Sequence, residues 1–523
     1  MIFIVTLNLA AAGALARTQA SEATSMAAVG ALPLLGDGSE MASGAERRLG
    51  DRIVRELYRD PDYLDDPVLT DYVQGIWQQL LAAARLRGDL TAELDERFAW
   101  KILLGRDRSV NAFALPGGYF GVNLGLLAVV GSRDELASVL GHELSHVTQR
   151  HISRLISKNA QQTPWLIGAM ILGALAASKN AEAGNALMVG GQALSAQSQL
   201  NFSRDMEREA DRQGFGVMTQ AGFEPLGFVT LFDKLQQAAR LNDNGAYPYL
   251  RSHPLTSERI ADMHSRLPLG TLHGSVPLPT ALHAMLVARA RVLSNQGIDA
   301  LRGWQPQAAD PATMSRSTQA GALYGAALAA SKLRDASQAQ RHQQRLQTLL
   351  ADDPPARQQA DWLGAEIALA ARDLARAQHW MAQALAVSEP GGSPATPTAP
   401  GRHRPALLLQ ARIALQSGTA QALDQSAQAL QSWLAHQPQD ALAWQSLAGV
   451  YAAQHQGLRA LRAQAEERVA QLDYAGALDR LKAAQDSVDN AAQNSSARHI
   501  DASIIDTRRR QVETLLGEQA LDR

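Results

Sequence analysis

The sequence has no cysteine, and its 523 residues include few aromatic side chains. A disulfide framework and a thiolate metal site are therefore excluded, so any metal must be held by His, Asp or Glu. Aromatic residues make up 5% of the chain and hydrophobic residues 46%, with a clear excess of alanine. This balance favours closely packed helices over a β-sandwich, and the length predicts about two or three folded units.

The chain also lacks an excess of charge of either sign. It has 49 basic and 51 acidic side chains, which give a formal net charge of −2. No long basic run is present that could neutralise a row of phosphates. We therefore expect no nucleic-acid partner.

Long hydrophobic runs are scarce, and the first of them lies at the N-terminus. Residues 1–20 form an apolar stretch followed by small residues, and either Ala16 or Ala20 ends an A-x-A cleavage pattern. This pattern predicts a secretory signal and an exported protein. It departs from the usual signal because no Lys or Arg precedes the apolar run.

A second apolar stretch runs from Pro164 to Ala177 and is shorter than the roughly 20 residues that cross a bilayer. We predict no membrane span there. Two interpretations stay open: a buried helix or flap packed on the neighbouring domain, or an interfacial segment that makes peripheral contact with a membrane or with apolar substrate.

Residues 45–269 combine helical periodicity with one block that is typical of strands. The block covers residues 98–104 and 111–122, and Pro116-Gly117-Gly118 predicts a turn between two short strands. A long amphipathic helix follows, for which Ser132 or Asp134 can serve as the N-cap. This region is predicted to be one domain, mostly helical with a small sheet.

Residues 277–523 change in character to helices that resemble tetratricopeptide repeats. Alanines recur seven residues apart on one face of two helices, at Ala377, Ala384, Ala477 and Ala484. Residues 389–405 read as a Pro/Gly-rich linker within the array. We expect about four repeats, and a plain helical bundle is the alternative.

The central helix contains an HExxH motif made by His142, Glu143 and His146. Histidines four residues apart project from one helix face and can grip a single Zn²⁺. Glu143 lies beside them, where a carboxylate can take a proton from the attacking water and pass it to the leaving amine. His151 comes five residues after His146, a helical spacing that predicts a structural or solvent-facing role.

A catalytic zinc needs a third protein ligand from elsewhere in the chain. Gln149 and Ile152 stand where a metzincin would need Gly and His, so that class is excluded. In the later segment SRDMEREAD, Glu207 and Asp211 share a helix face whereas Glu209 points away. We predict Glu207 as the third ligand and Asp211 as the carboxylate that orients His142. A solvated charged face is the alternative for this segment.

Four segments, NAFALPGG, HELSHVTQRH, SRDMEREAD and HPLTSERIAD, together resemble the peptidase family that includes HtpX and the CAAX prenyl proteases. The resemblance covers about residues 45–269. It implies a zincin-like domain that binds one Zn²⁺ through His142, His146 and Glu207, with Glu143 as the catalytic base. Asp211 matches a position that is often described as a proton donor in this family.

The resemblance also implies that the segment beginning NAFALPGG lines the substrate cleft. A peptide could add there as an extra strand and bind through its backbone, which would give broad specificity. The predicted substrate-binding residues are Asn111, Ala112, Phe113 and Ala114. The alternative is that this segment is only a hairpin of the core.

Two residues of the last segment have candidate roles. Arg259 could stabilise the oxyanion that develops on the attacked carbonyl, or it could be a structural arginine paired with an acidic side chain. His253 precedes Pro254, and the resemblance places it on a loop that approaches the metal. We therefore expect His253 to act as a regulatory latch that occupies the fourth coordination position; a histidine that only packs near the cleft is the alternative.

The signal-like start and the repeat array are most similar to the exported members of this family. That similarity implies a periplasmic zinc metalloendopeptidase for unfolded or misassembled outer-membrane proteins, with repeats that dock on the β-barrel assembly machinery. A second class of function also fits: a repeat-based chaperone or assembly factor whose peptidase site is normally silent.

Overall fold

The structure is a computed structural model that describes residues 41–158, 203–241, 247–267, 279–307, 314–386, 403–489 and 496–521. Three of the predicted segments therefore lie outside the described residues: the signal at 1–20, the apolar stretch at 164–177 and most of the linker at 389–405. Of that linker, Arg404 and Pro405 are already helical.

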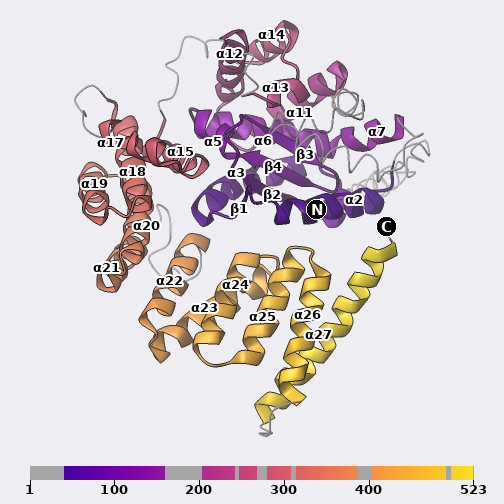
Figure 1. Ribbon diagram of the computed structural model, residues 1–523. Coiled ribbons are helices and arrows are strands. Elements are labelled where there is room, and N and C mark those ends of the chain that lie inside the picture. The colour runs from indigo at the N-terminus through magenta and orange to yellow at the C-terminus, as the bar shows by residue number, and fades with distance from the viewer. Residues whose placement is uncertain are drawn as a thin grey trace, which may run out of the picture.

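A small four-stranded sheet lies at the centre of the first half of the chain (Figure 1). The strands β1 (Tyr63–Leu64), β2 (Lys101–Gly105), β3 (Ala112–Leu115) and β4 (Tyr119–Asn123) are arranged in the order β1-β2-β4-β3. Strand β2 runs parallel to β4, and the other two pairs are antiparallel. Strand β3 is consequently an edge strand.

The predicted hairpin between β3 and β4 is confirmed. Gly117 and Gly118 have φ angles of 74° and 78°, which only glycine adopts without strain. A Cβ atom on Gly117 would lie 2.7 Å from the Cα of Arg47, so the backbone of helix α2 (Ser43–Arg59) can approach this turn only because glycine occupies it.

Helices cover both faces of the sheet. Leu103 and Leu115 pack with α2 and with α7 (His151–Lys158) on one face. On the other face, Ile102, Phe120 and Val122 join the main core with α3 (Pro67–Arg87) and α6 (Arg133–Thr148). The helix that carries the HExxH motif is thus packed directly beneath the sheet.

Among the described residues of this half there are six further helices: α4 (Ala92–Arg97), α5 (Leu124–Val129), α11 (Arg204–Gln220), α12 (Leu226–Leu241), α13 (Tyr249–Ser252) and α14 (Ser257–Arg266). Helix α11 crosses α6 where two glycines meet. A Cβ atom on Gly214 would lie 2.9 Å from the carbonyl carbon of Gly141. This close approach lets short acidic side chains of α11 reach the histidines of α6.

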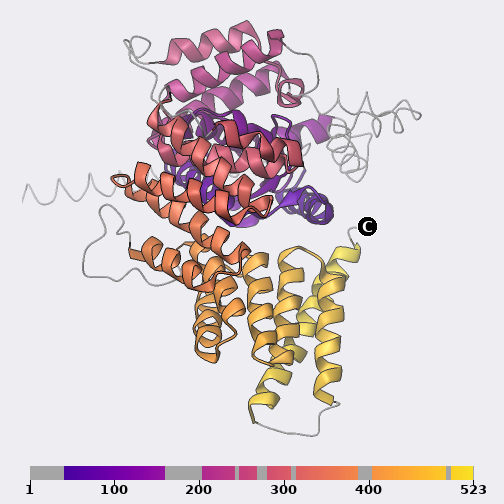
Figure 2. The same cartoon turned by 60° about the vertical axis from the view of Figure 1, so that its left-hand side comes forward.

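The second half is an array of helices stacked side by side (Figures 1 and 2). Its members are α15 (Ala281–Ser294), α16 (Ile298–Arg302), α17 (Trp304–Gln307), α18 (Arg316–Lys332), α19 (Ala336–Leu349), α20 (Pro354–Ala370), α21 (Leu374–Ala386), α22 (Arg404–Ser417), α23 (Ala420–His436), α24 (Ala441–Ala453), α25 (Gly457–Ala470), α26 (Tyr474–Asp489) and α27 (Ser496–Leu521). The predicted fold class, mostly α with a small sheet and a C-terminal helical array, is confirmed.

Three helix pairs of the array share one kind of turn. Arg334, Arg372 and Leu472 have positive φ angles, and each is followed by an aspartate at the start of the next helix. The alanines that predicted the pairs, Ala377, Ala384, Ala477 and Ala484, are all fully buried between helices. Small side chains at these positions allow neighbouring helices to pack closely.

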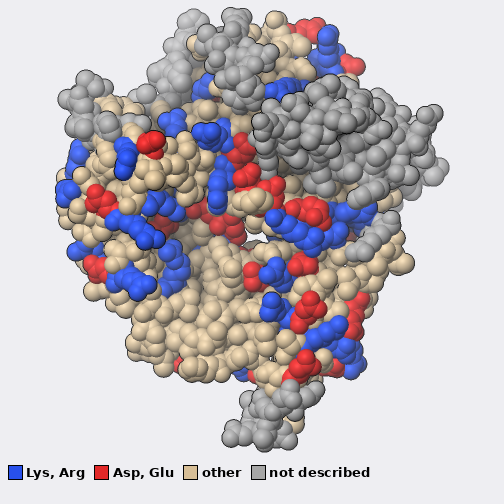
Figure 3. Space-filling view, in the orientation of Figure 1, with Lys and Arg blue, Asp and Glu red and all other residues tan. Residues whose placement is uncertain are grey.

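The two halves are joined by packing and by charge. Helix α15 contributes Leu286 and Leu293 to the core of the first half. Two arginines of the array bind the adjacent aspartates that precede α3: Arg289 binds Asp66 at 2.7 Å, and Arg404 binds Asp65 at 2.6 Å. Figure 3 shows acidic and basic side chains gathered along this junction. The domain boundary expected near residue 277 is therefore bridged by a shared core.

No helix in the described part of the chain is long and apolar enough to cross a bilayer.

Candidate metal centre

Helix α6 places the HExxH residues in the interior of the protein. Of the two predicted N-cap residues, Ser132 and Asp134, it is Ser132 that caps the N-terminus, by accepting the N–H of Glu135 at 3.1 Å. His142, Glu143 and His146 are each at most 1% exposed. The Nε2 atoms of the two histidines lie 3.0 Å apart, as expected for imidazoles one helical turn apart that face the same point.

Helix α11 brings Glu207 to these histidines. Its Oε2 lies 3.5 Å from Nε2 of His142, and its Oε1 lies 3.4 Å from Nε2 of His146. The side chain of Glu207 is 2% exposed. The predicted third ligand is therefore placed with the other two, whereas Glu209 lies on a different side of α11.

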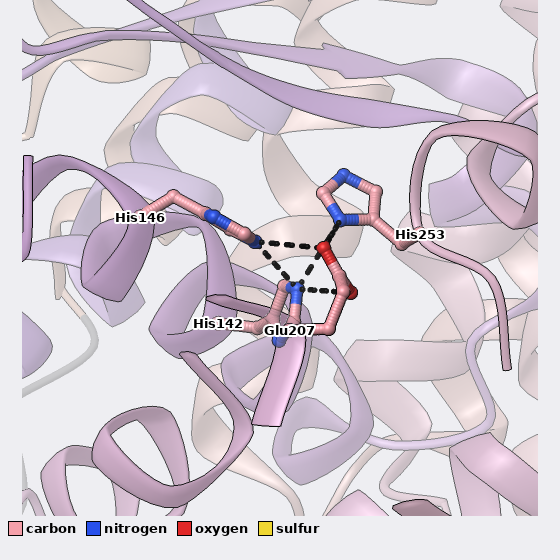
Figure 4. Close-up of side chains that lie close together, drawn as sticks. All are labelled: His142, His146, Glu207 and His253. Carbon is pink, nitrogen blue, oxygen red and sulfur yellow. Dashed lines mark hydrogen bonds and ion pairs between the residues drawn. The ribbon is translucent and has the colours of Figure 1, made fainter. Parts of the chain in front are cut away.

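His253, which directly follows α13, supplies a fourth donor. Its Nδ1 lies 3.0 Å from Oε1 of Glu207 and 3.3 Å from Nε2 of His142. One donor atom from each of His142, His146, Glu207 and His253 lies within 4.8 Å of all the others. Figure 4 shows the three imidazoles converging on the carboxylate of Glu207.

Asp211 and Arg259 form a layer behind the donors. Asp211 Oδ1 lies 2.9 Å from Nδ1 of His142, so this carboxylate is placed to orient the imidazole as predicted. Arg259 donates to both oxygens of Asp211 at 2.6 and 2.7 Å, and its Nη1 lies 2.8 Å from Oε2 of Glu207. The arginine is thus engaged with two carboxylates, which matches the structural alternative for Arg259; its oxyanion role stays a prediction.

Glu143 is the least satisfied group of the cluster. Both of its carboxylate oxygens are buried without a hydrogen-bond partner among the described residues, and Oε1 lies 3.5 Å from Nε2 of His253. Such a group is costly unless a partner arrives. The centre contains the buried carboxylates of Glu143, Glu207 and Asp211 and one guanidinium, that of Arg259. With ionised carboxylates and neutral imidazoles, these groups carry a net charge of −2. A divalent cation held by two nitrogens and an oxygen fits this centre.

Burial and the neighbouring charges shift the pKa values in the centre. Burial opposes a charge on His142, yet its contacts with Asp211 and Glu207 outweigh burial and raise its pKa to about 10. Burial lowers the pKa of His146. Burial also disfavours the charge on Glu207, but His253 and the other histidines hold its pKa well below the usual range. The pKa values of His142 and His146 are thus shifted in opposite directions, because only His142 contacts the carboxylate of Asp211 in addition to that of Glu207.

Of the two roles predicted for His151, structural or solvent-facing, the solvent-facing one is wrong and the structural one fits. His151 is fully buried, its Nδ1 lies 2.8 Å from Nδ1 of His146, and its Nε2 lies 3.0 Å from Oε2 of Glu209. The five-residue spacing gave the wrong orientation for His151 because α6 ends at Thr148. Arg150, which has a φ angle of 54°, then turns the chain before α7 begins. Glycine or asparagine usually marks such a turn, and an arginine gives no such signal.

The predicted substrate residues lie on and beside edge strand β3. The carbonyl of Asn111 accepts the N–H of Asn123, so Asn111 and Phe113 direct their backbone groups toward β4. Ala112 and Ala114 therefore direct theirs to the outer edge of the sheet. Strand β3 also packs against α6, which places this edge next to the metal centre. Substrate binding there stays a prediction.

Comparison with known proteins identifies the first half of the chain. Residues 71–267 match the model of Peptidase family M48. The beta-barrel assembly-enhancing protease of Escherichia coli (strain K12) is 31% identical over 233 residues, which cover 44% of this chain and 45% of the relative. The protein of the same name from Yersinia pestis is 30% identical over 321 residues, or 61% and 62% of the two chains.

A mitochondrial relative matches over a shorter stretch. Mitochondrial metalloendopeptidase OMA1 of Arabidopsis thaliana is 33% identical over 165 residues, which cover 31% of each chain. The matched stretches of the bacterial relatives span about half of their length. The family resemblance predicted from the motifs is confirmed, since the match to Peptidase family M48 covers residues 71–267 and so includes every residue of the centre described above.

Proposed function

We propose that this protein is a zinc-dependent endopeptidase that hydrolyses peptide bonds of unfolded or misassembled proteins. The observation that carries the proposal is the buried carboxylate of Glu143, which lacks a hydrogen-bond partner among the described residues and lies beside three convergent ligand side chains. A carboxylate in this position fits a general base that needs a water molecule within reach.

His142, His146 and Glu207 would hold the zinc ion. When bound, zinc would polarise the scissile carbonyl and lower the pKa of a water molecule at the site. Glu143 accepts the proton of the attacking water and returns it to the leaving amine. Asp211 keeps His142 in the tautomer whose Nε2 is free to bind metal, and Arg259 holds both Asp211 and Glu207 in place.

His253 is proposed as the latch. Four protein donors around one point are typical of a closed structural zinc site, whereas catalysis requires one open position. The segment that carries His253 is tied to the substrate edge, because the N–H of Tyr249 donates to the carbonyl of Val110 at 3.2 Å, one residue before Asn111. Removal of His253 from the cluster would open the fourth position.

The proposed substrate is an extended peptide that adds to the outer edge of β3. The backbone groups of Ala112 and Ala114 would pair with the peptide there, while Asn111, which precedes them, and Phe113, which lies between them, pair with β4. Backbone pairing depends little on side chains, so the cleavage preference should be broad.

The cellular setting is proposed from the relatives and the helical array together. Relatives named beta-barrel assembly-enhancing proteases support a role in outer-membrane protein quality control in the periplasm. The repeat array would recruit substrates or dock on the β-barrel assembly machinery. A chaperone or assembly factor with a silent peptidase site is the second candidate, and the closed four-donor cluster favours it.

The test compares the wild type with Glu143→Gln in metal content and in degradation of an unfolded outer-membrane protein. We expect the variant to retain zinc and to lose cleavage. Glu96→Gln, an exposed position on α4, is the matched control and should behave as the wild type. Equal cleavage by Glu143→Gln and the wild type would reject the enzyme. If neither cleaves but both suppress substrate aggregation, the chaperone is the better function.

A further inference from the structure

His146 has an outer partner of a different kind from that of His142. His142 contacts the carboxylate of Asp211 directly. His146 instead contacts a second imidazole, since its Nδ1 lies 2.8 Å from Nδ1 of His151. The far side of His151 then meets Glu209, with Nε2 at 3.0 Å from Oε2. Two imidazoles and one carboxylate thus form a chain that leads outward from the ligand cluster.

The direction of the hydrogen bonds in this chain is fixed at both ends. His146 directs Nε2 toward His142 and Glu207, so a metal at that point needs the lone pair of Nε2 and leaves the proton on Nδ1. His151 must then accept at Nδ1 and carry its own proton on Nε2, where Glu209 accepts it. Each imidazole then has one tautomer that satisfies the contacts with His151, Glu209 and a metal at Nε2 of His146.

Helix α7 and its leading turn hold the chain in place. Arg150 turns the backbone, and its Nη2 binds Oε2 of buried Glu46 at 2.8 Å. Arg154, one turn into α7, binds Oε2 of Glu209 at 2.9 Å. The carboxylate that ends the chain is therefore anchored by the same helix that supplies His151.

We propose that His151 and Glu209 are positioning residues of the metal centre, which hold His146 in the tautomer and ring orientation that bind metal through Nε2. Outer partners of this type orient ligands and raise their basicity. This explains how Glu209 takes part in the centre although it points away from the ligands. The inference rests on zinc binding at the proposed site and is independent of proteolysis.

The experiment measures zinc affinity by competition with a chromogenic chelator. His151→Leu removes the acceptor for His146 and fills its place with an apolar side chain of similar bulk, and we expect zinc affinity to fall by ~10–100-fold. His151→Gln offers an oxygen to His146 and an amide N–H to Glu209, so we expect affinity within about threefold of the wild type. An unchanged affinity in a folded His151→Leu would overturn the proposal.

A second readout separates positioning from simple packing. Cobalt(II) in place of zinc should give a shifted visible absorption spectrum in His151→Leu and a near-wild-type spectrum in His151→Gln. A packing role predicts instead that both variants lower the stability of the metal-free protein alike and leave the spectrum unchanged, which would also overturn the proposal. Wild type that binds no zinc would reject the proposed function itself.

Glu209→Ala carries the test if His151→Leu does not fold. It removes the terminal acceptor from a position that is partly exposed, and water can replace part of the contact. We expect a smaller loss of zinc affinity, about threefold to tenfold. Glu258→Ala is the matched control because it removes an exposed carboxylate that binds Arg208. Equal affinities in these two variants would reject a role for Glu209.

Discussion

Two buried arginines, each set between two carboxylates, serve the molecule in different ways. Arg259 lies in the metal centre between Asp211 and Glu207. Arg289 lies at the junction between the halves, where it binds Asp66 and Glu366 and also donates to the hydroxyl of Tyr324. Both arginine residues are at most 4% exposed.

The difference lies in what the carboxylates do on their other side. Glu207 and Asp211 also face histidines, so the guanidinium of Arg259 orients groups that remain available to a metal. At the junction, Asp66 instead caps α3 by accepting the N–H of Leu69 at 3.0 Å, and Glu366 is engaged with Arg289. The ion pairs of Arg259 therefore orient side chains of the candidate metal centre, whereas those of Arg289 join the two halves of the molecule.

The largest effect on zinc affinity is expected from a substitution in the carboxylate pair at Arg259, and none is expected from the same change in the pair at Arg289. Glu207→Gln replaces an anionic ligand with a neutral amide and should lower zinc affinity by more than the ~10–100-fold typical of outer partners, with cleavage falling as well. Glu366→Gln is the same chemical change at the junction and should leave zinc affinity unchanged. Zinc retained by Glu207→Gln but lost from Glu209→Gln would contradict the assigned ligand.

Arg289→Leu should break the junction without emptying the metal centre. Removal of one partner from a buried ionic network leaves charges uncompensated, a loss of ~3–5 kcal/mol in the free energy of unfolding. Urea denaturation measures the loss, and zinc content of the folded protein should stay at the wild-type level. A change below about 1 kcal/mol would show that packing, rather than Arg289, holds the halves together.

His253→Ala sharpens the comparison inside the centre, because His253 is the donor that would have to leave for catalysis. Three ligands remain, so zinc should stay bound while proteolysis of an unfolded substrate rises several-fold. Zinc content and initial cleavage rates are measured on the same preparation. Unchanged or lower activity at full zinc occupancy would eliminate the latch and favour a supporting role in substrate binding.

The smallest effect is expected where an arginine pair is exposed. Arg85 binds both oxygens of Asp95 at 2.8 Å, yet its side chain is 43% exposed. Arg85→Gln should change the free energy of unfolding by less than about 1 kcal/mol, since solvent screens the pair. A loss as large as that of Arg289→Leu would mean that geometry, not burial, sets the strength of these contacts.

Local patterns predicted much of the fold and of the centre. Spacing of four on a helix brought His142 and His146 together, and the same rule chose Glu207 over Glu209. The glycine pair at 117–118 predicted the hairpin, and the buried alanines predicted the helix pairs. Each of these inferences depends on residues close in sequence, where helix and strand geometry fix the direction of a side chain.

Contacts between the two halves, whose segments lie far apart in the sequence, were not predicted. The pairing of Arg289 and Arg404 with adjacent aspartates, and the packing of α15 on the catalytic half, join residues hundreds of positions apart. Sequence spacing carries no information about such contacts, since they depend on how whole helices dock. Helix α15, which follows the boundary predicted near residue 277, shares a core with the first half, and the boundary itself stays a prediction.

The sequence by itself determined the metal-binding chemistry, because an HExxH helix and an acidic helix offer their donors on one face wherever they are placed. Only the tertiary structure decided how those donors are supported. Arg150 adopts a left-handed backbone conformation, which a sequence without glycine at this position does not predict. This turn brings His151 back to His146. Helical spacing rules fail where a helix ends, and that end is held here by a contact with Glu46, more than a hundred residues earlier in the chain.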